Sequence, residues 1–222
     1  MNKTKTKTKM QITVLLADDH AVVREGLRVL LEQSADIRVV AEAANGREAV
    51  QLAQDLEPDV VLMDITMREL NGVDATRLVC EKCPATRVVM LSMHSNSEHV
   101  FRALEAGAKG FVLKESAGEE VAAAVRAVHS GQSYFSPAIT ALGSILQSRR
   151  GRASPLDRLS ARERQVLQLV AEGRTSAEIA LIMNLSPKTI ETYRVRLMKK
   201  LSVKNVAELI KFAVVHNLIP TG

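Results

Sequence analysis

The sequence predicts an α/β domain with a parallel sheet over residues 11–130, followed by a small all-helical domain from residue 158. Short apolar runs alternate five times with longer amphipathic segments in the first part, as expected for βα units. These runs are nearly continuous in apolar residues, which is typical of strands covered on both faces. From Leu159 onward the pattern is helical throughout. The 222 residues are long enough for two such domains.

The first domain is predicted element by element from this alternation. The expected strands are "ITVLLA" (12–17), "IRVVAEA" (37–43), "DVVLM" (59–63), "RVVMLS" (87–92) and "GFVLK" (110–114). The expected helices lie near 21–33, 46–56, 71–82, 97–106 and 117–130. Residues 131–157 mix Gly, Ser, Pro and Arg around one short apolar segment, about 138–146, and predict a linker that holds a short helix.

Start signals define the helices of the second domain. "SARE" (160–163) and "TSAE" (175–178) fit capping boxes, and "SPKT" (186–189) offers Ser186 as N-cap with Pro187 at the first helical position. A fourth helix is expected at about 204–216. Only "NL" or slightly more separates the second and third helices, which favours a helix-turn-helix.

Charge and composition bound the class of protein. Residues 11–130 carry 12 Lys and Arg against 19 Asp and Glu, whereas residues 154–222 carry 11 against 6, which suggests domains with different partners. Residues 1–10 form a basic repetitive tail, expected to be disordered, without the apolar core of a signal peptide. Without a membrane-length apolar run, we expect a cytoplasmic protein. Cys80 and Cys83 lack a second ligand pair, so partly buried helix residues are favoured over zinc or redox chemistry.

Polar residues stand where the predicted strands end. Asp18 and Asp19 follow the first strand, Asp64 the third, Ser92 the fourth and Lys114 the fifth. In flavodoxin-like order, 2-1-3-4-5, strands one and three are neighbours, so these side chains converge at the carboxyl edge of the sheet, where such folds bind ligands. Each residue taken alone can be explained without a functional site, for example as a helix cap or a surface lysine. The combination is far more specific.

Three clustered carboxylates repel one another, and a divalent cation removes that cost. Oxygen ligands at a site open to water favour Mg²⁺. A carboxylate there can act as a nucleophile and form an acyl phosphate, with Mg²⁺ and an ammonium neutralising charge on the phosphoryl group.

The motifs "LLADDH", "LMDITM", "VVMLSMHS" and "GAKGFVLKES" make residues 11–130 resemble the receiver domain of two-component response regulators. The resemblance implies that Asp64 accepts a phosphoryl group from a sensor histidine kinase. It implies that Asp19 and Asp64 bind Mg²⁺ directly, with Asp18 acting through water.

The same resemblance implies that the backbone carbonyl of Thr66 is a further Mg²⁺ ligand, that Ser92 and Lys114 hold the phosphoryl group, and that Phe111 is the aromatic switch residue. Beyond its own phosphorylation and dephosphorylation, no enzymatic activity is expected. One departure is visible, since Arg68 stands after "DITM" where the family usually has Pro. We expect a more mobile loop there.

Residues 159–219 resemble the LuxR-type DNA-binding domain, and the chain beyond residue 10 resembles the NarL/FixJ class. In the third helix, about 187–200, Ile190, Leu197 and Leu201 recur at helical spacing as a core face. The opposite face is a predicted major-groove reader. Its candidate DNA-contacting residues are Lys188, Thr189, Glu191, Thr192, Arg194, Val195, Arg196, Lys199 and Lys200.

By resemblance, Glu191, Thr192 and Val195 read bases, while a salt bridge from Glu191 to a neighbouring Arg is the alternative for that residue. Tyr193 stands where the family often has His. The last helix is expected to carry a homodimer contact, which calls for paired half-sites on double-stranded DNA, or simply to pack in the core. Phosphorylation is expected to draw in Ser92 and Phe111, reshape residues 92–115, and so control dimerisation or release the DNA-binding helix. RNA polymerase is a further candidate partner.

Three rival functions stay open on sequence alone. One is a DNA-binding regulator whose receiver ignores phosphate, and the second is a regulator that senses a small molecule. The third is a phosphohydrolase joined to an unrelated helical domain. The acidic residues argue against the first two, and no substrate pocket is visible for the third.

Overall fold

The computed structural model describes residues 11–93, 95, 97–141, 154–216 and 218–219. The predicted basic tail, residues 1–10, lies outside this range. Among the described residues, no helix combines the length and the apolar character needed to cross a membrane.

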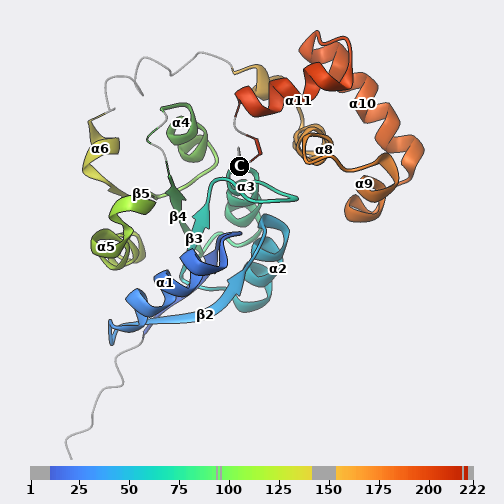
Figure 1. Cartoon of the computed structure of the whole chain (residues 1–222). Helices are drawn as coiled ribbons and strands as arrows, with labels where there is room; N and C mark the ends of the chain where they lie inside the picture. The colour runs from blue at the N-terminus through green and yellow to red at the C-terminus, as the bar shows by residue number, and fades with distance from the viewer. Residues whose placement is uncertain (1–10, 94, 96, 142–153, 217, 220–222) are drawn as a thin grey trace, which may run out of the picture.

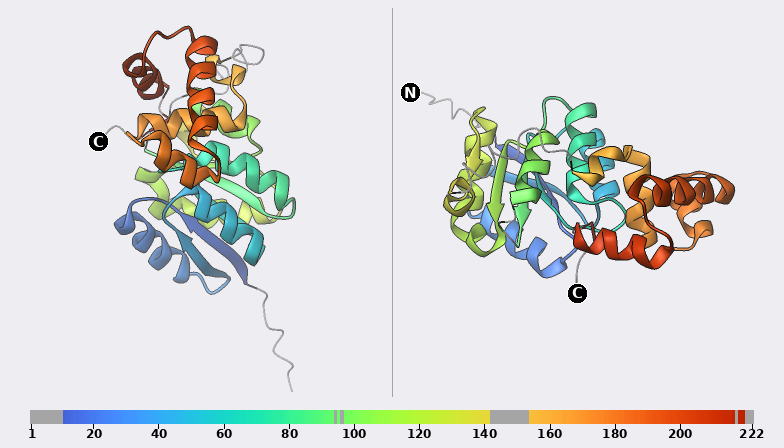
Figure 2. Two further views of the ribbon diagram at one scale, coloured as in Figure 1. Left: turned by 90° about the vertical axis from the view of Figure 1, so that its right-hand side faces the viewer. Right: turned by 90° about the horizontal axis from the view of Figure 1, so that it is seen from above.

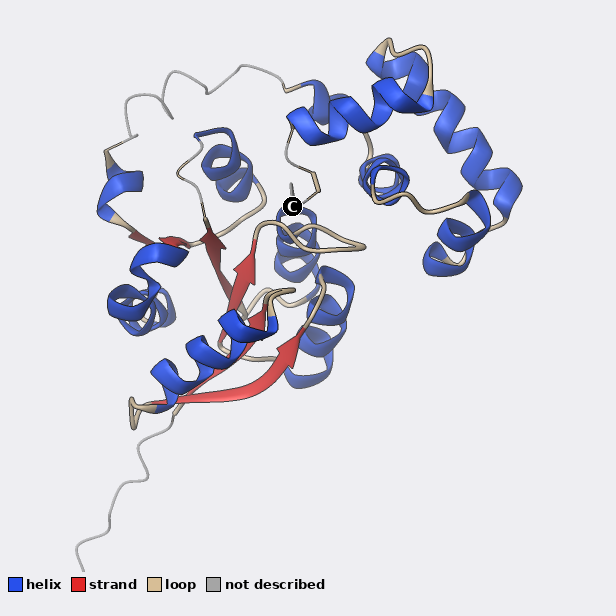
Figure 3. Ribbon diagram, in the orientation of Figure 1, coloured by secondary structure: helices blue, strands red, loops and turns tan. Residues whose placement is uncertain are grey.

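The first domain is a parallel sheet covered by helices on both faces, as predicted (Figures 1 and 3). Its strand order is β2-β1-β3-β4-β5-β6 and all five pairings are parallel. The strands are β1 (Ile12–Ala17), β2 (Ile37–Ala43), β3 (Val60–Asp64), β4 (Arg87–Ser92), β5 (Gly110–Leu113) and β6 (Tyr134–Phe135). The helices are α1 (Ala21–Glu32), α2 (Gly46–Leu56), α3 (Gly72–Lys82), α4 (Ser97–Glu105) and α5 (Ala117–His129).

Two apolar layers hold the sheet. The apolar residues of α2, α3 and α4 pack on one face together with Leu15, Met63 and Phe111. Those of α1 and α5 pack on the other, with Leu16 and Leu62. Alternate residues of one strand therefore serve opposite layers, as the period of two requires, and this explains why the strands read as continuous apolar runs.

The predicted linker contributes a sixth strand to the sheet, which was not predicted from the sequence. β6 pairs in parallel with β5, and the amide of Ser136 donates to the carbonyl of Phe111 at 3.0 Å. The short helix α6 (Pro137–Thr140) follows, at the start of the apolar segment, and its Ile139 is buried in the first apolar layer. A 3₁₀ turn, η2 (Pro155–Arg158), leads into the second domain. Residues 142–146 of the apolar segment lie outside the described residues.

The second domain is the predicted helical one. Its helices are α8 (Ala161–Ala171), α9 (Ser176–Met183), α10 (Pro187–Leu201) and α11 (Val206–Val215). The capping boxes at Ser160 and Thr175 form, and Ser186 caps α10. Asn184, with φ of +56°, ends α9, and residues 184–186 separate it from α10. These helices enclose a separate apolar core. Of the four, α8 lies beside α3 of the first domain (Figure 2).

Candidate functional site

The carboxyl ends of β1 and β3 bring the predicted acids together. One ligand atom from each of Asp18, Asp19, His20 and Asp64 lies within 4.8 Å of the others. Asp18 and Asp64 are buried, Asp19 is half-buried and His20 is exposed, so the group runs from the interior to the surface. His20 was not among the predicted ligands, although its place directly after the acid pair was a signal.

Lys114 closes the acidic group from the end of β5. Its Nζ atom lies 2.6 Å from Oδ2 of Asp18 and 3.0 Å from Oδ1 of Asp64. Ser92, buried at the end of β4, pairs in register with Leu113, the residue before Lys114. The structure thus places the hydroxyl-bearing and ammonium-bearing residues at adjacent strand ends, beside the carboxylates.

Burial sets the charge properties of this group. Burial raises the pKa of Asp64 to about 7, with Asp18 adding to the rise and Lys114 opposing it. Burial alone would lower the pKa of Lys114, but attraction by Asp64 and Asp18 outweighs it and raises this pKa above its usual value. Burial makes the charged form of Asp64 unfavourable. Binding of a cation, or a reaction that removes the negative charge from the carboxylate oxygen, is therefore more favourable here than at an exposed carboxylate.

The donor set fits a hard divalent cation. The buried oxygens Asp18 Oδ2 and Asp19 Oδ1 accept no hydrogen bond of good geometry among the described residues, although Nζ of Lys114 lies 2.6 Å from the first and Nδ1 of His20 lies 2.8 Å from the second. Carboxylate oxygens left in this way are the ligands that Mg²⁺ takes. Thr66, two residues after Asp64, is half-buried in the loop that follows β3. These residues are therefore suited to hold Mg²⁺.

The loop after Asp64 is tightly built. Gly72, the first residue of α3, packs so close that a Cβ atom there would lie 1.8 Å from the carbonyl oxygen of Asp64. Its amide donates to the carbonyl of Ile65 at 2.8 Å, and the amide of Ile65 donates to Leu91 at 3.0 Å. Only glycine allows this approach. Phe111, the predicted switch residue, is 1% exposed and pairs with Met90 and Phe135 on the adjacent strands.

Helix α10 presents the predicted DNA-reading face to solvent. Ile190 and Leu197 are fully buried and Leu201 packs against the same core, whereas Val195 is 60% exposed. The exposed candidates are Lys188, Glu191, Thr192, Val195, Arg196, Lys199 and Lys200, and Thr189 and Arg194 are half-buried. A hollow of about 330 Å³ at the start of the helix is lined by Ser186, Lys188, Thr189, Thr192, Tyr193 and Arg196.

Glu191, Arg194 and Lys200 make side-chain contacts within the domain. Glu191 bonds the hydroxyl of Ser176 and lies 3.4 Å from Arg194, whose Nη1 donates to Ser176 at 2.8 Å. The salt-bridge alternative for Glu191 is thus the one that the structure shows. Lys200 pairs with Glu163 at 2.7 Å. These contacts fix side chains around the exposed residues.

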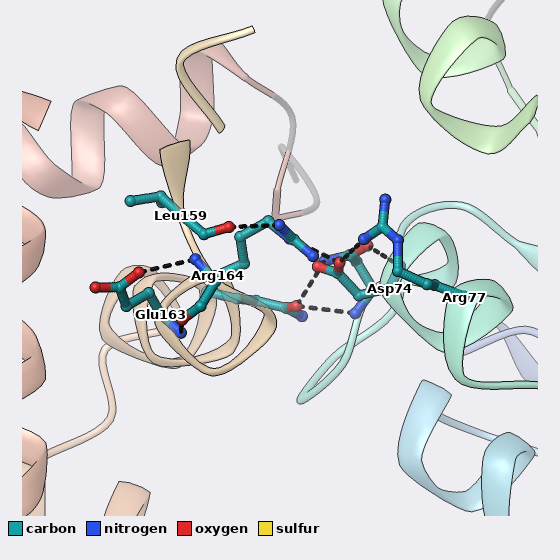
Figure 4. A network of polar contacts seen from close by, with 8 residues as sticks. Asp74, Arg77, Leu159, Glu163 and Arg164 are labelled. Atoms are coloured by element: carbon teal, nitrogen blue, oxygen red, sulfur yellow. Dashed lines mark hydrogen bonds and ion pairs between the residues drawn. The ribbon is translucent and has the colours of Figure 1, made fainter. Parts of the chain in front are cut away.

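A buried polar network joins the two domains (Figure 4). It was not predicted from the sequence. Nε of Arg164, on α8, donates to Oδ1 of Asp74, on α3, at 2.8 Å, and Nη1 donates to the carbonyl of Leu159 at 2.7 Å. Gln168, one turn further along α8, contacts Asn71 at the start of α3. The polar face of α8 is therefore covered by the first domain.

A second set of contacts lies near α4. Oε1 of Glu98 lies 3.4 Å from both the hydroxyl of Ser154 and Nδ1 of His216, which caps α11. A cavity of about 510 Å³ between the domains is lined here by residues of α3, α4, α8 and the 154–157 turn. The end of α11 is thus tied to the helix that follows β4.

Comparison with known proteins agrees with this geometry. Residues 14–126 match the response regulator receiver domain, and residues 157–213 match the bacterial regulatory proteins of the luxR family. The response regulator protein VraR of Staphylococcus aureus (strain Mu3 / ATCC 700698) is 36% identical over 210 residues, 95% of this chain and all of VraR.

Solved structures extend the comparison. A LuxR-family two-component response regulator from Aurantimonas sp. SI85-9A1 is 37% identical with a TM-score of 0.58, over 63% of this chain and 98% of that one. The response regulator RcsB in its DNA complex is 28% identical with a TM-score of 0.58, over 92% of this chain and 98% of that one. The chain is therefore a two-component response regulator of the NarL/FixJ class, with a receiver domain and a luxR-type helix-turn-helix domain.

Proposed function

We propose that a sensor histidine kinase phosphorylates Asp64 and that this controls DNA binding by the helical domain. The observation that supports it most is the placement of Asp64 between Asp18, Asp19 and Lys114 at the carboxyl edge of the sheet. An oxygen of the Asp64 carboxylate attacks phosphorus, the bond from phosphorus to the donor's imidazole nitrogen breaks, and an acyl phosphate forms. Bound Mg²⁺ would neutralise charge on the transferred group.

The chain's own residues have distinct tasks in this step. Asp18, Asp19, Asp64 and the Thr66 carbonyl would hold the cation. Lys114 now bridges Asp18 and Asp64, so its ammonium lies where phosphoryl oxygens would arrive. The hydroxyl of Ser92, on the strand between those of Asp64 and Lys114, would bind a further phosphoryl oxygen. The protein would act on no other substrate.

Intact mass tests the acceptor directly. The full chain is incubated with Mg²⁺ and acetyl phosphate, and we expect one added phosphoryl group that Asp64→Asn abolishes. Asp59→Asn is the matched control, because Asp59 lies just before the other end of the same strand and bonds Thr13 instead. Uptake that survives Asp64→Asn would end the assignment, and no uptake at all would favour a receiver that ignores phosphate.

For DNA, the supporting observation is the solvent-facing cationic surface of α10 around Val195. The RcsB structures include two dimers bound to two DNAs. We propose that this chain likewise binds double-stranded DNA as a homodimer on paired half-sites. RNA polymerase is a candidate partner at such sites.

The contacts of Glu98 support a route between the two events. Phe111 is already buried, so the coupling needs no change in its exposure. A shift of the β4–α4 segment on phosphorylation would instead displace Glu98 from Ser154 and His216 and free α11 for dimerisation. Moving such an equilibrium from 1:99 to 99:1 takes about 5.5 kcal/mol of differential stabilisation.

Selection of genomic DNA fragments, with and without acetyl phosphate, tests this function as a whole. We expect fragments with paired half-sites, enriched more strongly with the phosphodonor, and no such gain for Asp64→Asn. Equal enrichment by Asp64→Asn would disprove the coupling. Enrichment that depends on a metabolite and not on the phosphodonor would favour a small-molecule sensor.

A further inference from the structure

The loop between β3 and α3 has an unusual conformation for its sequence. Arg68 stands where a proline would have fixed the backbone, and it is exposed. Glu69 has a φ of +63°, in the left-handed region that disfavours side chains with a Cβ atom. The amide of Leu70 donates to the carbonyl of Arg68 at 2.7 Å, across only two residues. Such a turn persists only where its surroundings hold it.

The surroundings that hold this loop belong to the other domain. Nε2 of Gln168 donates to the carbonyl of Met67 at 2.8 Å, and its Oε1 accepts from the amide of Asn71 at 2.8 Å. Oε1 of Glu172 accepts from the amide of Glu69 at 2.9 Å and from Gln168 at 2.8 Å. Two side chains of α8 and its C-terminal end therefore bind three backbone groups of the loop.

The bonds made by Gln168 have little freedom to change. Its side chain is 0% exposed, so neither end can exchange its partner for water. An amide is the side-chain group that donates to a carbonyl at one end and accepts from an amide N–H at the other. A carboxylate of the same shape would retain the bond to Asn71 but lose the one to Met67.

Thr66 lies between two held positions. On one side, Ile65 bonds Leu91 and Gly72, and on the other, Met67 bonds Gln168. Among the hydrogen bonds of the described residues, none uses the carbonyl of Thr66. The neighbours of this carbonyl are thus held on both sides, and the carbonyl itself has no hydrogen-bond partner among the described residues, so it is free to serve as a cation ligand.

We propose that Gln168 of the DNA-binding domain is a positioning residue for the cation-binding loop of the receiver. It bonds Met67 and Asn71 and so holds the Thr66 carbonyl in place. This loop needs such support because Arg68, unlike a proline, does not restrain the backbone. Glu172 supports it through Glu69. Preorganisation of a ligand in this way raises affinity because less freedom is lost on binding. The inference rests on the proposed function of the acidic site.

The test is titration of the full chain with Mg²⁺ by calorimetry, without phosphodonor. For Gln168→Ala we expect the Mg²⁺ Kd to rise about tenfold, the lower end of what loss of an outer-shell partner costs a metal site. Gln168→Glu should show the same loss, because it lacks the donor to Met67. Glu172→Ala should show a smaller one.

Gln165→Ala is the matched control. Gln165 lies on the same helix, is nearly as buried, and has no side-chain hydrogen bond among the described residues. We expect its Mg²⁺ Kd to match that of the parent chain. A rise equal to that of Gln168→Ala would overturn the proposal in favour of a general loosening of the domain interface.

Two further readouts separate positioning from a structural defect. In Gln168→Ala, phosphoryl uptake from acetyl phosphate should need more Mg²⁺ for half its maximal rate but reach the parent rate at saturation. Amide hydrogen exchange should accelerate over residues 66–71 and stay unchanged over 21–32. An unchanged Mg²⁺ Kd in Gln168→Ala would refute the inference alone, whereas a parent chain that binds no Mg²⁺ through Asp64 would refute the proposed function.

Discussion

Arg164 of the helical domain and Asp74 of the receiver form a buried ion pair, with Nε 2.8 Å from Oδ1. Their side chains are 10% and 4% exposed, and Arg77 shares the same carboxylate oxygen at 3.0 Å. A buried pair contributes little net stability when intact, but its rupture leaves an uncompensated buried charge. Removal of Arg164 while the domains stay together would therefore leave the buried Asp74 carboxylate, among the described residues, with only the partly exposed Arg77 as an ion-pair partner.

Arg164→Ala should make the domains separate. Loss of one partner from a buried pair typically costs about 3–5 kcal/mol, and here the chain relieves that cost by exposing Asp74 to water. We expect a larger radius of gyration in small-angle X-ray scattering and faster amide hydrogen exchange at Asn71 and Asp74, which α8 covers in the parent chain. Arg158→Ala is the control, since Arg158 is exposed in the adjoining turn. An unchanged radius would show that other contacts hold the domains.

Asp64→Asn should stabilise the chain at alkaline pH in Mg²⁺-free buffer. The folded-state pKa of Asp64 is raised from 3.8 to about 7, so the folded chain binds a proton that the unfolded chain has already lost. Proton binding by Asp64 therefore contributes to the free energy of unfolding. The contribution is complete below pH 3.8 and is lost as the pH rises through 7, where the buried carboxylate becomes charged. The variant's Tm should exceed the parent's by several degrees at pH 8, and the difference should shrink at pH 5.

Asp59→Asn provides a control of opposite sign. Burial opposes the charge on Asp59, but its hydrogen bonds with Thr13 and the attraction of His129 and Arg87 lower the pKa below 3.8. Its contribution is present above pH 3.8 and is lost on acidification. This variant should be less stable than the parent at pH 8. A fall in Tm for both variants at pH 8 would contradict the inferred charge state of Asp64.

Mg²⁺ should stabilise the folded chain. A ligand that binds only the folded state adds about 2.7 kcal/mol at a concentration 100 times its Kd, which for a chain of this size corresponds to a Tm rise of about 5–10 °C. Asp19→Asn should remove most of this rise in a thermal scan. Asp36→Asn should not, because Asp36 pairs with Arg126 on another part of the surface. An equal rise in all three proteins would place the ion elsewhere.

The elements of this chain could be predicted because their signals are local. The apolar runs and the caps at Ser160, Thr175 and Ser186 specify strands and helices within a few residues of themselves. Asp18, Asp64 and Lys114 could be brought together because parallel topology sends all strand ends to one edge. Strand β6 escaped prediction, since two residues carry no periodicity and the pairing of Tyr134 depends on an available edge.

The contacts between domains could not be predicted, because Gln168 and Asn71 are 97 residues apart in sequence. Arg164, Gln165 and Gln168 are polar residues of the kind that an amphipathic helix usually turns to solvent, yet all three are buried. The sequence of a polar helix face does not tell whether water or another domain covers it, since the same side chains form hydrogen bonds with either.

Lys199→Ala and Val195→Ala should affect DNA binding differently. Both side chains are exposed on α10, but an ammonium pairs with phosphates whereas an apolar group contacts base edges. Lys199→Ala should weaken binding to specific and unrelated DNA alike and reduce the slope of log K against log salt by about one per bound subunit. Val195→Ala should retain the slope and relax the preference at one base pair of each half-site.

Fluorescence anisotropy with labelled duplexes at several salt concentrations measures both quantities. Lys82→Ala is the matched control, because it removes the same charge from an exposed side chain at the end of α3 in the receiver. It should leave slope and preference unchanged, which excludes a mere effect of net charge. If Lys199→Ala leaves the salt slope intact, or Val195→Ala changes the slope and not the preference, then α10 does not approach the major groove with the face opposite Ile190 and Leu197.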